Sequence, residues 1–220
     1  QAKSFILAVG STPSFDPAWK NELGDRLITS NQIFELNALP KSLAVIGSGV
    51  IAIELAQAMQ RLGVNTTVFA RSRKVGVLTS PKLQQLAQTE ISTELEIKFE
   101  VLPTEVKYIN NQVELRFTEN GQPKTLNVDY LLVATGRSSL LNTLKLENID
   151  TSFKDLKHLP VDPETKQLAD YPIFIIGDAH TDTPLQHEAA HEGKVSVKNA
   201  LNFPTIESCK TLIPLGIVFS

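Results

Sequence analysis

The sequence predicts an α/β fold built on a parallel sheet, and three observations support this prediction. An apolar run at 43–46 leads directly into the turn Gly47-Ser48-Gly49. The stretch after this turn has apolar residues at helical spacing and ends at Gly63. A second apolar run, at 66–69, follows closely. Strand, tight turn, helix and strand in this order form the unit from which parallel sheets are built.

The turn itself has the pattern of a Rossmann-type dinucleotide-binding site. Gly47 permits the tight turn, Gly49 lets the backbone approach a pyrophosphate, and small Ala52 lets the helix pack closely on the strand. The first amides of the helix, at Val50 and Ile51, would receive the diphosphate together with the positive end of the helix dipole. The alternative is a glycine turn in an ordinary parallel sheet. The complete strand–helix–strand context favours dinucleotide binding.

Composition excludes several classes of protein. The chain has 220 residues, is 42% hydrophobic and 20% charged, and carries a formal net charge of -3. A nucleic-acid partner is not expected, because such proteins usually have a basic surface, and no apolar run has the ~20 residues of a membrane helix. Cys209 is the single cysteine, and the histidines have no metal-binding spacing. We therefore expect a cytoplasmic protein without a metal site. The absence of an initial Met favours a piece of a longer chain.

The segments before the fingerprint are predicted to be short. We expect a strand at 4–9, a polar connector at 16–25 in which Trp19 is a packing anchor, and a short helix at 31–36. A lone strand at 4–9 needs partners from elsewhere in the chain.

Two amphipathic helices should cover the sheet. The first is indicated by Ile51, Leu55, Met59 and Leu62, which recur at steps of three and four residues. The second should begin at Ser80-Pro81, because serine suits the N-cap and proline the first helical position. Its apolar face is predicted to comprise Leu83, Leu86, Ala87 and Ile91.

After these helices the pattern changes to short strands. A strand at 96–102 precedes alternating segments that predict an antiparallel meander, and 130–135 is a closing parallel strand. Residues 138–168 have the composition of a mostly polar connector. The remaining expected elements are meander strands at 106–109, 113–118 and 125–128, a strand at 173–176, a helix at 184–201 and a strand at 213–219.

Four motifs in this order resemble the pyridine nucleotide-disulfide oxidoreductase family, the class I flavoproteins. The motifs are FILAVGSTP, GSGVIAIE, LLVATGR and IFIIGDAHTDTPLQHEAAHEG. The family includes dihydrolipoamide dehydrogenase, glutathione reductase and mercuric reductase. Its members insert a nicotinamide-dinucleotide domain into an FAD-binding domain and add a C-terminal interface domain. The resemblance thus implies a Rossmann-type domain with a β-meander, flanked by parts of an FAD-binding domain.

The resemblance also implies how the chain is divided. Residues 1–28 would be part of the FAD domain and a connector, 29–145 the NAD(P)-binding domain, 146–205 the returning part of the FAD domain, and 206–220 the start of the interface domain. The family's pair of redox cysteines would lie before residue 1, and most of the interface domain after residue 220. These residues alone should therefore not catalyse disulfide chemistry.

The activity implied by the resemblance is that of a dihydrolipoamide-dehydrogenase-like oxidoreductase. Hydride would pass between NAD(P)(H) and FAD, coupled to a dithiol or disulfide such as the lipoamide of a 2-oxoacid dehydrogenase complex. The full-length protein would be a homodimer. Alternatives are an NADPH-dependent disulfide or mercuric reductase and a soluble pyridine nucleotide transhydrogenase. An alternative of another class is a module that senses nucleotides without catalysis.

Three residues of the predicted nicotinamide site have assigned roles. Glu54 matches the glutamate that orients the nicotinamide carboxamide in the family, although a carboxylate near a helix start is also favourable to the helix dipole. Arg71 and Arg73 follow Ala70, which stands where an acidic residue would bind the ribose of NAD. Guanidinium groups suit a 2′-phosphate, whereas a solvated basic loop is the alternative. The arginines favour NADP(H) or dual use, but dihydrolipoamide dehydrogenases usually prefer NAD, so the choice stays open.

The predicted flavin side rests on two further motifs. Gly136 and Arg137 match an element that lies between the two cofactors in the family, although two serines follow here where the family commonly has Pro-Asn. Gly177 and Asp178 match the element whose aspartate accepts hydrogen bonds from the ribityl chain of FAD, with a strand-end turn as the alternative. His187 matches a histidine near the flavin, although a helical histidine is often a packing residue.

Overall fold

The structure is a computed structural model that describes residues 2–180 and 184–208. The chain forms two compact units. The continuous unit is 13–136, and the split unit is made of the described residues of 1–12 and 137–215. The predicted domain boundaries at 28/29, 145/146 and 205/206 concern cofactor and interface domains, so they stay predictions. The assignment of the segments to particular cofactor domains stays a prediction.

The continuous unit contains a five-stranded parallel sheet in the order β3-β10-β4-β5-β6. The central strand β4 is paired with β10 on one side and β5 on the other, with Val45 opposite both Leu132 and Val68. The sheet strands are β3 (Leu27–Ile28), β4 (Ser42–Ile46), β5 (Asn65–Ala70), β6 (Glu96–Phe99) and β10 (Tyr130–Val133). This arrangement confirms the predicted α/β class.

Alternate residues of the sheet contribute to two separate cores. Val45 and Val68 pack with the helices α2 (Val50–Arg61) and α3 (Pro81–Glu94) on one face. Phe69 points to the opposite face, where its ring meets that of Phe117 edge-on with the centroids 5.0 Å apart. Because both faces are covered, the strands have nearly continuous apolar sequences, as is usual for parallel sheets. The predicted buried strands 43–46 and 66–69 therefore lie in the sheet.

The apolar row of helix α2 is buried only in part, since Met59 lies in the core and Leu55 packs against it. Ile51 and Leu62 are 40% and 61% exposed, whereas the residues on the sheet side are Ala52, Ile53, Ala56 and Met59. Small alanines bring the helix close to the sheet, so the contact face is offset from the row of largest side chains. The predicted face of helix α3 is also confirmed only in part, because Ile91 is buried and Ala87 packs against the core, whereas Leu83 and Leu86 are exposed.

The second face of the sheet is covered by an antiparallel meander and a short helix. The predicted meander is present, with the order β7-β8-β9, and its strands are β7 (Glu105–Ile109), β8 (Gln112–Glu119) and β9 (Gln122–Val128). The polar connector predicted at 16–25 is instead helix α1 (Pro17–Leu23). Asp16 caps this helix by accepting from the Ala18 amide at 2.8 Å. Trp19 packs in this core, as expected.

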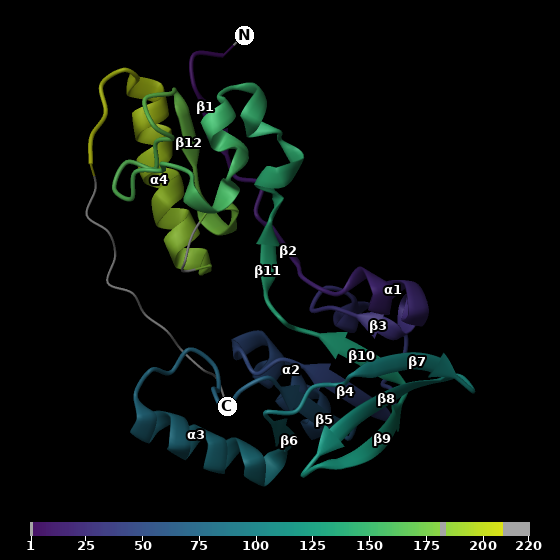
Figure 1. The fold of residues 1–220 in the computed structure, drawn as a ribbon. Helices are drawn as coiled ribbons and strands as arrows, with labels where there is room; N and C mark the ends of the chain where they lie inside the picture. Colours follow the sequence, from purple (N-terminus) through teal and green to yellow (C-terminus); the bar gives the residue numbers. More distant parts are fainter. Residues whose placement is uncertain (1, 181–183, 209–220) are drawn as a thin grey trace. The chain divides into compact units, whose positions relative to one another are not determined.

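In the split unit, two strands far apart in sequence lie side by side. Strand β1 (Phe5–Leu7) is parallel to β12 (Ile173–Ile175), and Ile6 lies opposite Phe174. Helix α4 (Gln186–Asn202) packs along both strands (Figure 1). Short strands β2 (Ser11–Pro13) and β11 (Arg137–Ser139) also pair with each other. The distant partner that a strand at 4–9 requires is therefore β12.

The segment 138–168 is more than the polar connector that its composition predicts. It forms successive 3₁₀ turns at Leu140–Thr143, Leu146–Asn148, Thr151–Lys154 and Leu156–His158. Apolar residues of these turns, among them Leu141 and Phe153, are about 1% exposed and form a core with Ile175. The composition obscures this core because its apolar residues are widely spaced. The strand expected at 213–219 lies outside the described residues.

Candidate functional site

The fingerprint turn of the continuous unit requires glycine at its first position. Gly47 follows β4 with φ +127°, a conformation that L side chains rarely adopt. A Cβ atom here would lie 2.4 Å from the carbonyl oxygen of Ala134, which cannot easily move because it belongs to the backbone. The Gly47 amide donates to Phe69 at 2.9 Å. Gly47 therefore fixes the path of the turn between two strands.

The second glycine of the turn leaves space for a ligand. Gly49 is the exposed N-cap of α2, and no atom lies within 4 Å of the position that a Cβ would occupy there. No side chain caps the helix at Gly49. The first amides of a helix have no acceptor within the helix, so those of Val50, Ile51 and Ala52 are donors at the positive end of the dipole. Space and donors together fit the diphosphate of a dinucleotide.

The other predicted residues of this unit lie around the same end of the sheet. Ala52 is fully buried and its Cβ lies 3.4 Å from the position of a Cβ on Gly47, which accounts for the small residue. Glu54 is half-buried near the start of α2. Strand β5 ends at buried Ala70, after which Arg71 and Arg73 are exposed. The structure thus brings the fingerprint turn and the arginine loop to the carboxyl ends of adjacent strands β4 and β5.

In the split unit, the carboxyl ends of β1 and β12 bring three polar side chains together. Ser11 Oγ donates to Asp178 Oδ2 at 2.9 Å. Arg137 donates to Ser11 twice, from Nε to Oγ at 2.7 Å and from Nη2 to the carbonyl oxygen at 2.8 Å. Arg137 Nε also lies 3.7 Å from Asp178 Oδ2. Arg137 and Asp178, which are far apart in sequence, therefore form one cluster with Ser11.

The turn that carries Asp178 is held from helix α4. Glu192 is only 4% exposed, and its carboxylate accepts from the Gly177 amide at 2.6 Å. Lys166 Nζ neutralises the other oxygen of this carboxylate at 2.8 Å. Gly177 has φ +60°, and a Cβ there would lie 3.2 Å from Ala189. A buried ion pair and a close helix contact thus fix the position of the turn.

The two other predicted residues are not part of this cluster. The carbonyl oxygen of Gly136 accepts from Ser14 at 3.0 Å, and its φ of +118° explains the glycine. His187 is exposed in the first turn of α4, and its Nε2 lies 3.8 Å from Glu188 Oε1. Neither position has a described contact with the Asp178 carboxylate.

Several residues of these sites were not identified from the sequence. Ser11, Lys166 and Glu192 belong to the split unit's cluster or to its support, and Gln84 and Gln88 contact the arginine loop. Ser11 had a usable signal, because it directly follows a strand-ending glycine, as Asp178 does. Glu192 also had one, since a carboxylate on an otherwise buried helix face requires a partner.

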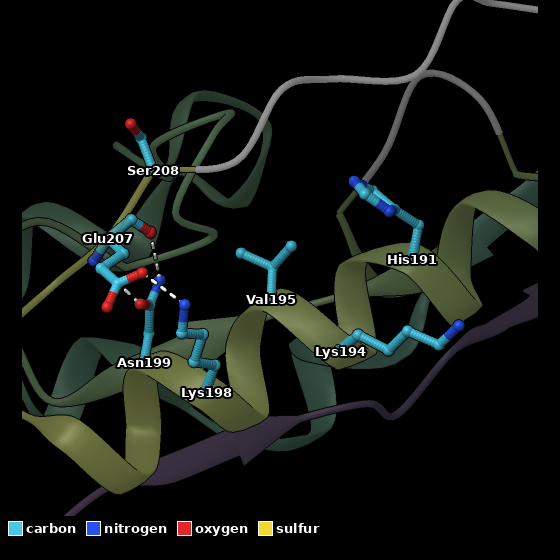
Figure 2. Close-up of a pocket in the computed structure, with 7 residues that line it drawn as sticks. All are labelled: His191, Lys194, Val195, Lys198, Asn199, Glu207 and Ser208. Carbon is cyan, nitrogen blue, oxygen red and sulfur yellow. Dashed lines mark hydrogen bonds and ion pairs between the residues drawn. The ribbon is translucent and has the colours of Figure 1, made fainter.

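A pocket of about 310 Å³ lies along α4, but it contains none of the predicted site residues (Figure 2). Its polar groups bind each other. Asn199 and Glu207 exchange hydrogen bonds of 3.0 Å between side chain and backbone, and Lys198 is paired with the Glu207 carboxylate. These pairs occupy Lys198, Asn199 and Glu207 with one another, and none of the predicted motifs lines the pocket, so it is a weaker candidate than the two strand-end sites.

The described residues contain neither a candidate metal site nor a candidate membrane span. Among them, no group of three or more His, Cys, Asp or Glu side chains could hold a metal ion. None of the helices in residues 2–180 and 184–208 combines the length and apolar character needed to cross a bilayer.

Most of the chain matches a known protein family. Residues 1–193 match the model of the pyridine nucleotide-disulphide oxidoreductase family. The chain belongs to this family. The predicted family is therefore confirmed and, at the level of the family, so are the class of FAD- and NAD(P)-dependent oxidoreductases and the α/β fold.

Several relatives match most of this chain. A dihydrolipoyl dehydrogenase of Staphylococcus aureus is 30% identical over 197 residues, which is 89% of this chain and 42% of that protein. One from Chlamydia pneumoniae is 32% identical over 200 residues, 90% of this chain and 42% of that protein. A mercuric reductase of Staphylococcus aureus is 29% identical over 221 residues, 100% of this chain and 40% of that protein. The chain thus spans about two fifths of these relatives.

Solved structures of the family have the same fold. LpdA from Mycobacterium tuberculosis superposes with a TM-score of 0.78 at 24% identity, covering 93% of this chain and 44% of that one. The HOCl-induced flavoprotein disulfide reductase RclA from Escherichia coli gives 0.73 at 18% identity, covering 93% and 46%. At 24% and 18% sequence identity, the similarity to these two structures shows a shared fold only.

Proposed function

We propose that the protein acts as a flavoprotein oxidoreductase of the dihydrolipoyl dehydrogenase type, which couples NAD(P)(H) and FAD to a dithiol or disulfide. The observation that carries this proposal is the fingerprint turn, where Gly49 leaves open space in front of the first amides of α2. The similarity to dihydrolipoyl dehydrogenases supports the choice within the family. When bound, the nicotinamide and the flavin supply the hydride chemistry.

In this proposal the continuous unit binds the nicotinamide dinucleotide. Gly47 and Gly49 shape the turn, and the amides of Val50, Ile51 and Ala52 bind the diphosphate. Glu54 orients the nicotinamide, and the loop with Arg71 and Arg73 meets the adenosine ribose or its 2′-phosphate. The half-buried position of Glu54 near the helix start is consistent with such a contact.

The split unit binds FAD in the same proposal, with Asp178 as the acceptor for ribityl hydroxyl groups. One oxygen of this carboxylate already accepts from Ser11, but an ionised carboxylate has several lone-pair sites and can accept more. Gly177 gives the turn its shape, while Gly136 and Arg137 belong to the segment that leads into this site. His187, on the exposed first turn of α4, is the remaining proposed flavin neighbour.

The proposed substrate is a dithiol such as the lipoamide of a 2-oxoacid dehydrogenase complex, and the proposed full-length form is a cytoplasmic homodimer. The names of the dihydrolipoyl dehydrogenase relatives support the substrate class. A single cysteine in this chain is compatible with a reducing compartment.

The decisive experiment uses the full-length protein loaded with FAD. Dihydrolipoamide-dependent reduction of NAD⁺ and of NADP⁺ should be followed side by side. Activity with either nucleotide supports the proposal, and their ratio gives the specificity. No activity with either, in a protein that retains its flavin, would contradict the assignment to lipoamide.

A second function in the same class is an NADPH-driven disulfide or mercuric reductase. Exposed Arg71 at the end of β5 favours it, because a guanidinium suits a 2′-phosphate. The similarity to a mercuric reductase over the whole chain supports the same alternative. NADPH-dependent reduction of Hg²⁺ or of a small disulfide, without lipoamide activity, would distinguish it.

A further inference from the structure

The loop after β5 is anchored, although it carries exposed charges. Val75 is fully buried in the core that α2 and α3 share. The next amide, that of Gly76, donates to the carbonyl oxygen of Ser48 at 2.8 Å. Ser48 is the middle residue of the diphosphate turn. The loop is therefore joined to the proposed nucleotide site by its backbone, in contrast to an ordinary solvated loop.

Helix α3 holds the same loop through the side chain of Gln84. Its Oε1 accepts from the Val75 amide at 2.9 Å, and its Nε2 donates to the carbonyl oxygens of Val75 at 3.0 Å and Leu78 at 2.6 Å. One turn further along α3, Gln88 Nε2 donates to the carbonyl oxygen of Arg73 at 2.5 Å. These contacts go to backbone groups, so they determine the course of the loop without depending on its side chains.

The two arginines of the loop are in different situations. The Arg73 guanidinium lies over the ring of Phe99, with Cζ 5.2 Å from the ring centroid. Such a cation–π contact keeps the side chain against the sheet. Within residues 2–180 and 184–208, no ion pair, hydrogen bond or ring contact engages the exposed Arg71 side chain. Arg71 is thus the guanidinium that is available to a ligand, whereas Arg73 supports the loop.

We propose that Gln84 is a positioning residue for nucleotide specificity, which holds the loop so that Arg71 meets a 2′-phosphate. This inference rests on the proposed function, because it assumes that the continuous unit binds a nicotinamide dinucleotide. Preorganisation by Gln84 lowers the ordering cost of binding. In the proposed binding mode the loop meets the adenosine ribose, so the benefit is specific for ligands with a phosphate on that ribose.

The test compares two ligands that differ only in this phosphate, 2′,5′-ADP and 5′-AMP, by calorimetry on the full-length flavoprotein. Wild type should bind 2′,5′-ADP more tightly. In Gln84→Ala, the affinity for 2′,5′-ADP should fall about tenfold while that for 5′-AMP changes less than about twofold. Gln84→Glu should have a similar effect, because a carboxylate cannot donate to Val75 and Leu78. The matched control is Gln85→Ala, which changes an exposed glutamine on the same helix and should leave both affinities unchanged.

A double-mutant cycle shows whether Gln84 acts through Arg71. If it does, Arg71→Ala and the double variant should lose the same affinity for 2′,5′-ADP, since removing the guanidinium leaves Gln84 nothing to position. Amide exchange at Val75 and Gly76 should accelerate in Gln84→Ala but not in Arg71→Ala. Additive losses, or equal weakening of both ligands in Gln84→Ala, would overturn the inference. Binding of neither ligand by wild type would overturn the proposed function as well.

Discussion

The two candidate sites use different parts of the chain to contact a ligand. In the continuous unit, the groups that face the ligand space are backbone amides beyond Gly49, and the side chains there mainly support the turn. In the split unit, they are the side chains of Ser11, Arg137 and Asp178, which already bind each other. Ligand binding at the first site should therefore be sensitive to an added Cβ atom, and binding at the second to the chemical groups of its side chains. Substitutions can test this difference.

The largest expected effect is that of Gly47→Ala compared with Gly49→Ala. A methyl group on Gly47 would meet the Ala134 carbonyl oxygen and keep a positive φ, so it should destabilise the continuous unit by about 3 kcal/mol. On Gly49 it meets nothing within 4 Å, so stability should change by less than about 0.5 kcal/mol. Dinucleotide affinity should nevertheless fall. Chemical unfolding measures the stability of each variant, and nucleotide titration measures its affinity. Normal nucleotide binding by Gly49→Ala would contradict a binding site made of backbone amides.

The buried ion pair of the split unit gives the next largest effect. Glu192→Gln removes the charge opposite Lys166 and should cost about 2 to 3 kcal/mol of unfolding free energy, because one partner of a buried pair is left without compensation. Glu207→Gln is the matched control on the exposed pair with Lys198, where a loss below about 1 kcal/mol is expected. Urea unfolding measures the free energy of unfolding of both variants. Equal losses would show that the Glu192 pair contributes no more to stability than the exposed Glu207 pair.

The split unit's side-chain chemistry is tested by Asp178→Asn. The amide keeps the shape but weakens acceptance from hydroxyl groups, so FAD affinity should fall about tenfold with little loss of stability. Asp170→Asn is the control, since Asp170 is an exposed acidic residue of the same unit. Flavin retained after gel filtration and the flavin absorbance of each variant give the comparison. Unchanged retention in Asp178→Asn would remove Asp178 from the proposed site.

The smallest effect concerns how carboxyl pKa values respond to salt. Hydrogen bonding from the Thr165 amide is the main cause that lowers the pKa of Asp162 in the split unit. In the continuous unit, hydrogen bonding from Lys124 and Lys98 lowers the pKa of Glu119. A carboxyl group whose pKa is lower in the folded than in the unfolded protein stabilises the fold at pH values above its unfolded pKa. The contributions of both groups to stability are therefore lost as the pH falls below about 4.

Ionic strength should separate these two carboxyl groups. Raising NaCl to about 1 M screens charges over a few ångströms, so the pKa of Glu119 should rise toward its ordinary value. The pKa of Asp162 should move less, because backbone amides carry no net charge. Carboxyl ¹³C titration at two salt concentrations measures this, with wild type at low salt as its own control. Equal changes in the two pKa values would mean that ion pairing is the main cause of the lowered pKa in both units.

The comparison also explains what could be predicted from the sequence. The fingerprint turn was identified because its signals are local: glycines, an apolar strand and a helical repeat within 43–69. The buried face of α2 was identified only in part, because Met59 belongs to the apolar row whereas Ala52, Ile53 and Ala56 lie beside it. The core from Leu141 and Phe153 follows neither a helical nor a strand period, so 138–168 had no recognisable pattern.

The side-chain cluster was predictable only in part. A motif singled out Asp178 and Arg137, but their common partner Ser11 lies 167 positions before Asp178. Nothing within a local window connects such residues, since the contact results from the pairing of β1 with β12. Gln84 is near Val75 in the sequence, but a glutamine in a helix has no pattern that marks it as a partner of loop backbone groups.

The pairing of β1 with β12 has a consequence for synthesis on the ribosome. Every partner within the continuous unit, 13–136, is translated before β12 appears, so that unit can fold while β1 still lacks its parallel neighbour. Domains generally fold as units as they leave the ribosome. We therefore expect the pairing of β1 with β12 to be completed after the continuous unit has folded, although β1 precedes that unit in the chain.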